Sequence, residues 1–148
     1  MTFTQTCVIP LERERLWEFL MDVPRVAQCV PGVESVEAID GGAYRGSLRV
    51  QVGPIRLVLH GSMTVEEQDR EGWRARMRAE ASDRRVGGGL RARLGLALAA
   101  VEGGTRLHID TDLTILGKIG EFGQPVIKKK ADTLLEEFAR NLRSALAA

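Results

Sequence analysis

The sequence predicts an α+β fold, in which helices cover one face of an antiparallel sheet, and three observations support this. Apolar and polar residues alternate with a period of two through most of residues 44–115, as in half-buried strands. Apolar residues at helical spacing bracket this stretch, at 10–29 and again from residue 118 onward. A chain of 148 residues has the usual length of one domain, so we expect a single domain over residues 1–148.

The N-terminal region is predicted to contain one strand and two short helices. The segment "TFTQTCVI" alternates, with Phe3, Cys7 and Ile9 on one face. From Pro10 the spacing becomes helical, and the apolar stripe of this helix consists of Leu16, Trp17 and Leu20. A second helix, at about Pro24 to Cys29, ends at Pro31-Gly32, where the chain turns toward the sheet.

The alternating region is predicted to form a meander of about six strands on one apolar face. Its turn signals are "GP" at 53–54, "DREG" at 69–72, "VGGG" at 86–89 and "EGG" at 102–104. A one-residue slip of any strand would bury its arginines, so the register is well determined. The main inward-facing residues are Leu48, Val50, Val52, Leu57, Leu59, Met63, Ala75, Met77, Ala79, Ala92, Leu94, Leu96, Leu107, Ile109 and Leu113.

The C-terminal region is predicted to be one long helix that begins at Lys118. Its apolar residues recur at steps of three, four and seven, and include Ile119, Phe122, Val126, Leu134, Leu135, Phe138, Leu142 and Leu146. Pro125 should kink or divide this helix, because proline lacks the amide hydrogen that the preceding turn requires. Glycines at 117, 120 and 123 should make the first turns the loosest part.

The inward-facing residues include almost no ionisable group, so general acid–base catalysis has no obvious machinery. Tyr44 and Thr111 are the only inward polar candidates by parity. Both histidines, His60 and His108, fall on the polar parity of their strands, and no metal-ligand spacing includes either. We therefore predict no catalytic and no metal-binding residues. A formal net charge of +1 gives no overall reason to expect nucleic acid as a partner.

The small inward residues, Gly46, Gly61, Ala75, Ala79, Ala81 and Ala92, raise the question of an apolar cavity beneath the helix. The alternative is that Trp17, Phe19, Phe122 and Phe138 fill this space completely. Residue patterns alone leave the two alternatives equally open.

Four segments cover most of the chain and carry a resemblance to a known family: "VIPLERERLWEFLMDVPRVAQCVPGVESVE", "VQVGPIRLVLHGSMTVEEQD", "GTRLHIDTDLTILGKIGEFGQPVI" and "LLEEFARNL". In these segments the chain resembles the CoxG family of carbon monoxide dehydrogenase subunits, within the START-like (SRPBCC) superfamily of helix-grip folds. The resemblance implies a seven-stranded antiparallel sheet curved around the long C-terminal helix, with two short helices after the first strand and a cavity between sheet and helix. The cavity-lining residues expected on this basis are Leu48, Val50, Leu57, Leu59, Met77, Leu94, Leu96, Ile109, Leu113, Phe122 and Val126.

Proteins of this family accompany molybdenum-containing hydroxylases such as carbon monoxide dehydrogenase. They are associated with membrane recruitment or with carrying a lipophilic quinone between the enzyme and the membrane. The resemblance therefore implies a non-enzymatic protein that binds menaquinone or a similar apolar lipid, without a metal or covalent cofactor. Its implied location is cytoplasmic, with peripheral contact at the inner face of the membrane.

Two other functions stay open. One is a structural adaptor with a filled core, which would recruit the hydroxylase through its arginine-rich outer face. The other is an enzyme of the cyclase or dehydratase type, which shares the superfamily fold but needs inward polar groups.

Overall fold

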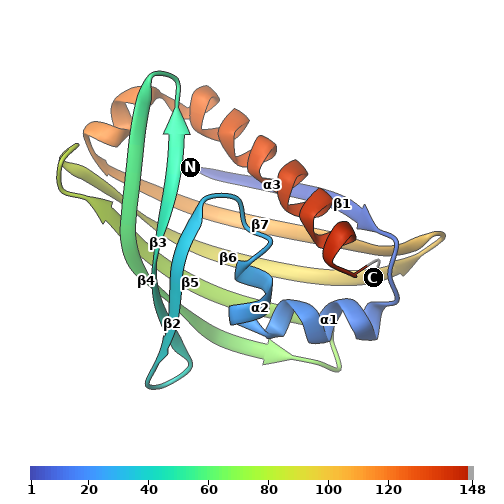
Figure 1. Cartoon of the computed structure of the whole chain (residues 1–148). Helices are drawn as coiled ribbons and strands as arrows, with labels where there is room; N and C mark the ends of the chain where they lie inside the picture. Colours follow the sequence, from blue (N-terminus) through green and yellow to red (C-terminus); the bar gives the residue numbers. More distant parts are fainter. Residues whose placement is uncertain (147–148) are drawn as a thin grey trace.

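The computed structural model describes residues 1–146 and contains one seven-stranded antiparallel sheet with helices on one face, here called the inner face (Figure 1). The last two residues of the predicted domain, 147–148, lie outside the described residues. The strands are β1 (Thr2–Ile9), β2 (Val33–Ile39), β3 (Ala43–Val52), β4 (Ile55–Asp69), β5 (Arg74–Asp83), β6 (Gly88–Val101) and β7 (Gly104–Gly117). The helices are α1 (Arg13–Met21), α2 (Val23–Ala27), the 3-10 helix η1 (Lys118–Phe122) and α3 (Gln124–Leu146).

The sheet has the order β1-β7-β6-β5-β4-β3-β2, so the meander from β2 to β7 is closed on its β7 side by the N-terminal strand. Every pairing is antiparallel, and the register confirms the predicted inner and outer faces. Opposed inner pairs include Leu48 with Leu59, Met63 with Ala79, Met77 with Leu94, and Leu96 with Ile109. The predicted α+β class and the seven-stranded helix-grip arrangement are therefore confirmed.

The closing helix begins later than predicted. Residues 118–122 form η1, and α3 starts only at Gln124, so the expected helix from Lys118 is wrong for its first turns. The reason is local: Gly117 and Gly123 have φ values of +67° and +83°, which interrupt any right-handed helix on both sides of η1. Pro125 stands in the first turn of α3, where its missing amide hydrogen costs nothing.

The second short helix is also shorter than predicted, spanning Val23–Ala27 rather than 24–29. The Asp22 carboxylate accepts a hydrogen bond from the Arg25 amide at 3.4 Å, which caps its N-terminus. Two residues past the helix, Cys29 donates its amide hydrogen to the Val26 carbonyl, so a tight turn replaces the last predicted helical residues.

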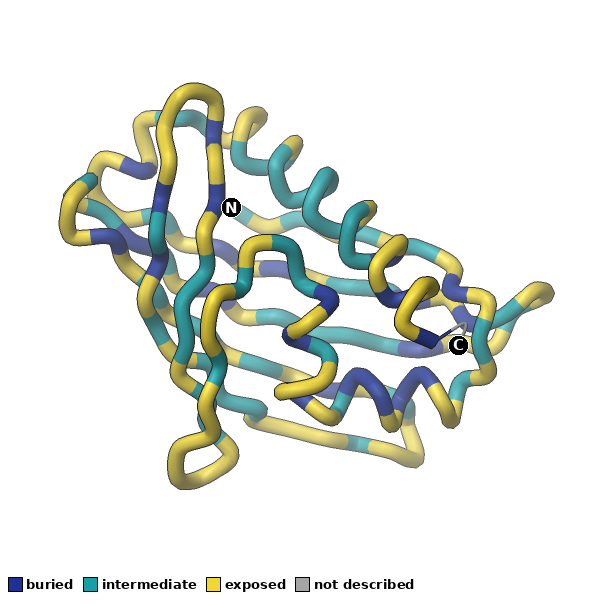
Figure 2. The backbone as a smooth tube through the Cα atoms, viewed as in Figure 1, coloured by how far each residue is buried: buried dark blue, intermediate teal, exposed yellow. Residues whose placement is uncertain are grey.

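The buried core is divided into two clusters. In the first, α1 and the C-terminal turns of α3 pack on β1, β6 and β7, and its members include Ile9, Leu16, Trp17, Phe19, Leu107 and Leu142. The second lies where β3 and β4 meet η1, and its buried members are Val50, Val52, Leu57, Leu59 and Ile119. Trp17 is held in the first cluster, edge-to-face with Trp73 at a centroid distance of 6.0 Å. Figure 2 shows buried positions on α1, at the corner after α2 and along the strands, whereas the first turns of α3 are half-buried or exposed.

Two glycines permit close approach of neighbouring strands in the middle of the sheet. Gly46 and Gly61 are opposed in the β3–β4 register, and Gly61 is opposed to Ala81 of β5. A Cβ atom on Gly61 would overlap the carbonyl oxygen of Glu80, and one on Gly46 would overlap that of Ser35. The inner face of this row therefore has almost no side-chain volume, which leaves space above it.

Asp83 at the end of β5 is a buried carboxylate that ties β4 to the β5–β6 turn. Its side chain is 3 % exposed and accepts hydrogen bonds from the Val58 amide at 2.8 Å and from the Arg85 amide at 3.0 Å. The Val58 amide and the Arg85 guanidinium lower the pKa of Asp83 from 3.8 to about 2.

This lowered pKa predicts a pH dependence of stability. The ionised carboxylate stabilises the fold fully above pH 3.8, and that stabilisation is lost as the pH falls toward 2. Asp83→Asn should therefore lower the free energy of unfolding at pH 7, and its difference from the wild type should shrink between pH 4 and pH 2. Denaturant unfolding at stepped pH measures this difference. Asp40→Asn, in the exposed β2–β3 turn, should show no such difference, and a constant deficit for Asp83→Asn would contradict the prediction.

Candidate ligand-binding cavity

A cavity of about 410 Å³ lies between the inner face of the sheet and the helices. It occupies the space between the two core clusters, above the Gly46–Gly61 row. The main inward side chains that the sheet contributes are Val33, Val36, Tyr44, Leu48, Leu59, Met63, Met77, Ala79, Ala81, Leu90, Leu96, Leu107 and Ile109. The wall is therefore almost entirely aliphatic or thioether.

The opposite wall comes from α1, α2 and the turn after them, with one contribution from α3. These residues are Leu20, Val23, Val26, Ala27, Val30 and Phe138. None of the first five was predicted to line the cavity. These five residues could have been found from the sequence, because they are spaced by three and four and continue the apolar stripe of α1 through α2.

Of the eleven expected lining residues, five lie on the cavity wall: Leu48, Leu59, Met77, Leu96 and Ile109. Val50 and Leu57 are buried in the second core cluster, and Phe122 packs against it. Leu94 and Leu113 lie on the inner face of the sheet but do not line the cavity, and Val126 is exposed. Whether any of the eleven contacts a ligand stays a prediction.

The polar chemistry of the cavity is limited to very few groups. Arg45 and Glu80 also adjoin the cavity, but their side chains extend from the outer face of the sheet and are exposed. Gln5, on the inner face of β1, donates its amide hydrogen to Asp132 of α3 at 2.8 Å. Among residues 1–146, no group of three or more His, Cys, Asp or Glu side chains is arranged to hold a metal ion.

Cys29 lies at the corner between α2 and β2 and is buried in the first core cluster. Burial raises the pKa of its thiol, and the smaller opposing effect of Arg25 does not reverse this. Its carbonyl oxygen accepts a hydrogen bond from the Asn141 side chain at 3.0 Å, which joins the corner to α3. A protonated, buried thiol of this kind is a packing residue and not an activated nucleophile.

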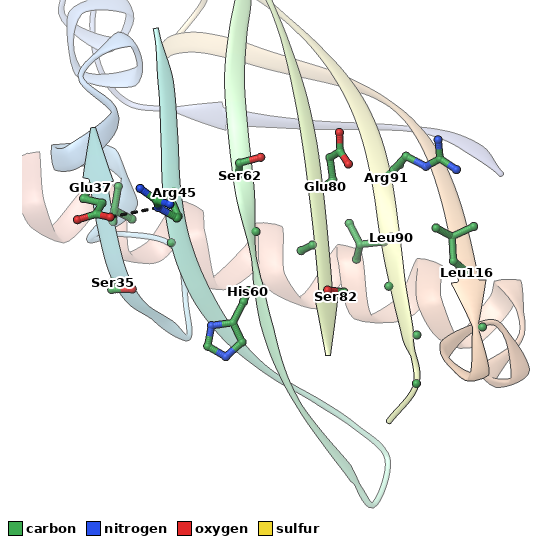
Figure 3. Close-up of a pocket in the computed structure, with 18 residues that line it drawn as sticks. Ser35, Glu37, Arg45, His60, Ser62, Glu80, Ser82, Leu90, Arg91 and Leu116 are labelled. Atoms are coloured by element: carbon green, nitrogen blue, oxygen red, sulfur yellow. Dashed lines mark hydrogen bonds and ion pairs between the residues drawn. The ribbon is translucent and has the colours of Figure 1, made fainter. Parts of the chain in front are cut away.

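A larger hollow of about 1160 Å³ lies on the outer face of the sheet (Figure 3). One cross-strand row supplies many of its polar side chains, in the order Glu37, Arg45, Ser62, Glu80 and Arg91. The Arg45 guanidinium donates to Glu37 at 3.2 Å, and both side chains are more than 60 % exposed. Because the row alternates charges and is open to solvent, this hollow is not suited to an apolar ligand.

Within the part of the chain that the structure describes, no helix is both long and apolar enough to cross a membrane.

Solved structures share this fold at low sequence identity. A conserved protein from Geobacillus kaustophilus is 18 % identical, with a TM-score of 0.89 over 99 % of this chain and 95 % of that chain. A START superfamily protein from Mycobacterium smegmatis is 15 % identical, with a TM-score of 0.66 over 99 % and 97 % of the two chains. The Zhui aromatase/cyclase from Streptomyces sp. R1128 is 15 % identical, with a TM-score of 0.65 over 98 % and 92 %.

No curated protein matches the sequence significantly. The family model of the CoxG subunit of carbon monoxide dehydrogenase, however, matches residues 6–147, which is almost the whole chain. That match includes every residue that lines the cavity. The chain belongs to the CoxG family of carbon monoxide dehydrogenase subunits.

Proposed function

We propose that this protein binds an uncharged, largely apolar molecule in its cavity and carries it for a molybdenum hydroxylase of the carbon monoxide dehydrogenase type. The main observation that supports this proposal is the cavity of about 410 Å³ with its aliphatic wall. Its volume falls within the usual range for small-molecule sites, about 300–1,000 Å³. Burying apolar surface there contributes about 25 cal/mol per Å². Menaquinone fits this chemistry, because its naphthoquinone ring is uncharged and its isoprenoid tail is a hydrocarbon.

The unfilled space favours a carrier over an adaptor. An adaptor that only recruits a partner needs no cavity, and close-packed cores normally leave few voids larger than a water molecule. In this protein Trp17 and Phe19 pack in the first core cluster, and Phe122 packs against the second. Of the aromatic residues expected to fill the centre, only Phe138 reaches the cavity wall.

The absence of paired acid and base groups on the described cavity wall favours binding over catalysis. An aromatase/cyclase with the same fold shows that this architecture can support an enzyme. General acid–base chemistry requires titratable groups within reach of the substrate. In the described part of this wall, Tyr44 is the only inward side chain with a titratable proton.

The direct test is to extract the purified protein with organic solvent and identify co-purifying molecules by mass spectrometry, beside titration with quinones. A stoichiometric apolar compound and saturable quinone binding are expected. If there is neither a bound lipid nor saturable binding, the carrier function is wrong.

One end of the molecule supports a peripheral membrane contact. Three exposed aliphatic side chains belong to this end, here called the apolar tip: Ile55 at 37 %, Leu116 at 41 % and Val126 at 45 % exposure. They belong to the start of β4, the end of β7 and the start of α3, which lie at the upper left of Figure 1. Two exposed cations lie nearby in the chain: Arg56 directly follows Ile55, and Lys118 is two residues after Leu116. Aliphatic tips beside cations are typical of surfaces that bind anionic bilayers.

We expect the double variant Ile55→Asp/Val126→Asp to bind vesicles containing anionic phosphatidylglycerol at least about tenfold more weakly than the wild type. Vesicle co-sedimentation at two salt concentrations measures this binding. Val8→Asp/Ile39→Asp removes equally exposed aliphatic residues elsewhere and should bind as the wild type does. Equal loss in both variants would show that the apolar tip has no special role.

A further inference from the structure

Tyr44 is the one inner-face residue of the described cavity wall that has a hydroxyl group, and no other group of residues 1–146 is hydrogen-bonded to that hydroxyl. We infer that this hydroxyl donates a hydrogen bond to a carbonyl oxygen of the bound molecule, which makes Tyr44 the residue that favours a carbonyl-bearing ligand over a pure hydrocarbon. This inference rests on the proposed carrier function and adds a specificity-determining residue to that same cavity.

The side chain of Tyr44 contributes to the cavity wall. It lies on the inner face of β3, opposite Ala38 of β2 and Met63 of β4. The next inner position along β3 is Gly46, and Gly61 lies opposite that glycine. Because neither glycine has a side chain, the part of the cavity floor next to Tyr44 is bare.

Other inner-face polar groups are already paired or lie off the wall. Thr105 donates its hydroxyl hydrogen to the Leu11 carbonyl at 2.7 Å, and Gln5 is paired with Asp132. Thr111 is buried and does not line the cavity. Among residues 1–146, no hydrogen bond from another side chain or from the backbone reaches the Tyr44 hydroxyl. Its hydrogen-bonding capacity is therefore free for a ligand.

The surrounding charges exclude an anionic head group inside the cavity. The nearest guanidinium in sequence, that of Arg45, is on the outer parity and is paired with Glu37. A carboxylate or phosphate placed beside Tyr44 would be desolvated without a cation, at a cost of several kcal/mol. A neutral carbonyl accepts one hydrogen bond from a phenol and needs no counter-charge.

The experiment compares two probes of the same shape, menadione (2-methyl-1,4-naphthoquinone) and 2-methylnaphthalene, which lacks the carbonyl groups. Tyr44→Phe removes one oxygen atom from the cavity wall. We expect it to weaken menadione binding about three- to tenfold and to leave 2-methylnaphthalene binding unchanged. Thr64→Val, which removes a hydroxyl from the outer face of β4, should change neither affinity. Intrinsic fluorescence titration measures both affinities, and circular dichroism confirms the fold of each variant.

The outcomes separate this inference from the function on which it rests. If the wild type binds both probes and Tyr44→Phe binds menadione equally well, the hydrogen bond is refuted while the carrier function stands. An equal loss for both probes refutes it too, because it indicates a packing role for the ring. If the wild type binds neither probe, the carrier function fails and the ligand assignment fails with it.

Discussion

Ala79→Phe should abolish binding of apolar ligands, with a loss of at least about 100-fold in affinity, which corresponds to about 2.7 kcal/mol. Ala79 faces the cavity from the middle of β5 and is opposed to Met63 on one side and Ala92 on the other. A phenyl ring at this position enters the space that the ligand would occupy. Since the cavity is unfilled, the ring displaces no packed side chain and the fold should be retained.

The matched control for Ala79→Phe is Arg78→Phe, one residue earlier on the same strand. Arg78 is exposed on the outer face, so the same ring is introduced there without reaching the cavity. Quinone titration should give wild-type affinity for this control. If Ala79→Phe bound quinone as the wild type does, the ligand would have to bind outside this cavity, and the proposed binding site would be wrong.

Leu142→Ala should lower the free energy of unfolding by about 2–5 kcal/mol, the range for removing a large buried side chain. Leu142 is 0 % exposed and joins α3 to Ile9, Leu16 and Leu107 in the first core cluster. With a typical domain stability of about 5–15 kcal/mol, this is a large fraction of the total. Thermal melts should show a midpoint lowered by about 10 °C, at about 2–4 °C per kcal/mol for a domain of this size.

Leu116→Ala is the matched control, because it deletes the same atoms from a leucine that is 41 % exposed. Its midpoint should lie within about 2 °C of the wild type, since surface substitutions usually change stability by less than about 0.5 kcal/mol. Equal destabilisation by both variants would mean that α3 is not held by this contact.

The strand faces could be predicted from the sequence because their arginines make every alternative register costly. Arg76 and Arg78, for example, must point outward if Ala75, Met77 and Ala79 point inward, and the structure has this arrangement. Strand positions depend on a period of two, which local sequence reports directly.

The cavity wall was less predictable because it depends on how helices pack in three dimensions. Helical spacing identified Phe122, Val126 and Phe138 as one stripe, but the break at Gly123 separates the first of these from α3. Only Phe138 then reaches the cavity, and α2 supplies the wall that the first two were expected to provide. The positive φ of Gly123 changes the direction of the chain between η1 and α3, and this changes which side chains reach the cavity. The spacing of apolar residues contains no information about such a change of direction.

The turn at Pro31-Gly32 was predicted from the sequence, and the structure shows why it requires a glycine. Gly32 has a φ of +86°, and a Cβ atom there would overlap the Arg49 carbonyl oxygen, so the residue admits no side chain. Burial raises the Cys29 pKa, in agreement with a packing role for its sulfur.

The uneven attachment of α3 has a kinetic consequence. Its fully buried residues, Ala139, Leu142 and Leu146, all lie in its last turns, while its first turns have only half-buried and exposed residues. Amide hydrogen exchange should therefore be slow at the C-terminal end and progressively faster toward Gln124. Phe138, the residue that α3 contributes to the cavity wall, directly precedes the buried Ala139. The cavity side of α3 is therefore fixed at the slowly exchanging end of the helix, and the fast-exchanging first turns can open without disturbing the wall.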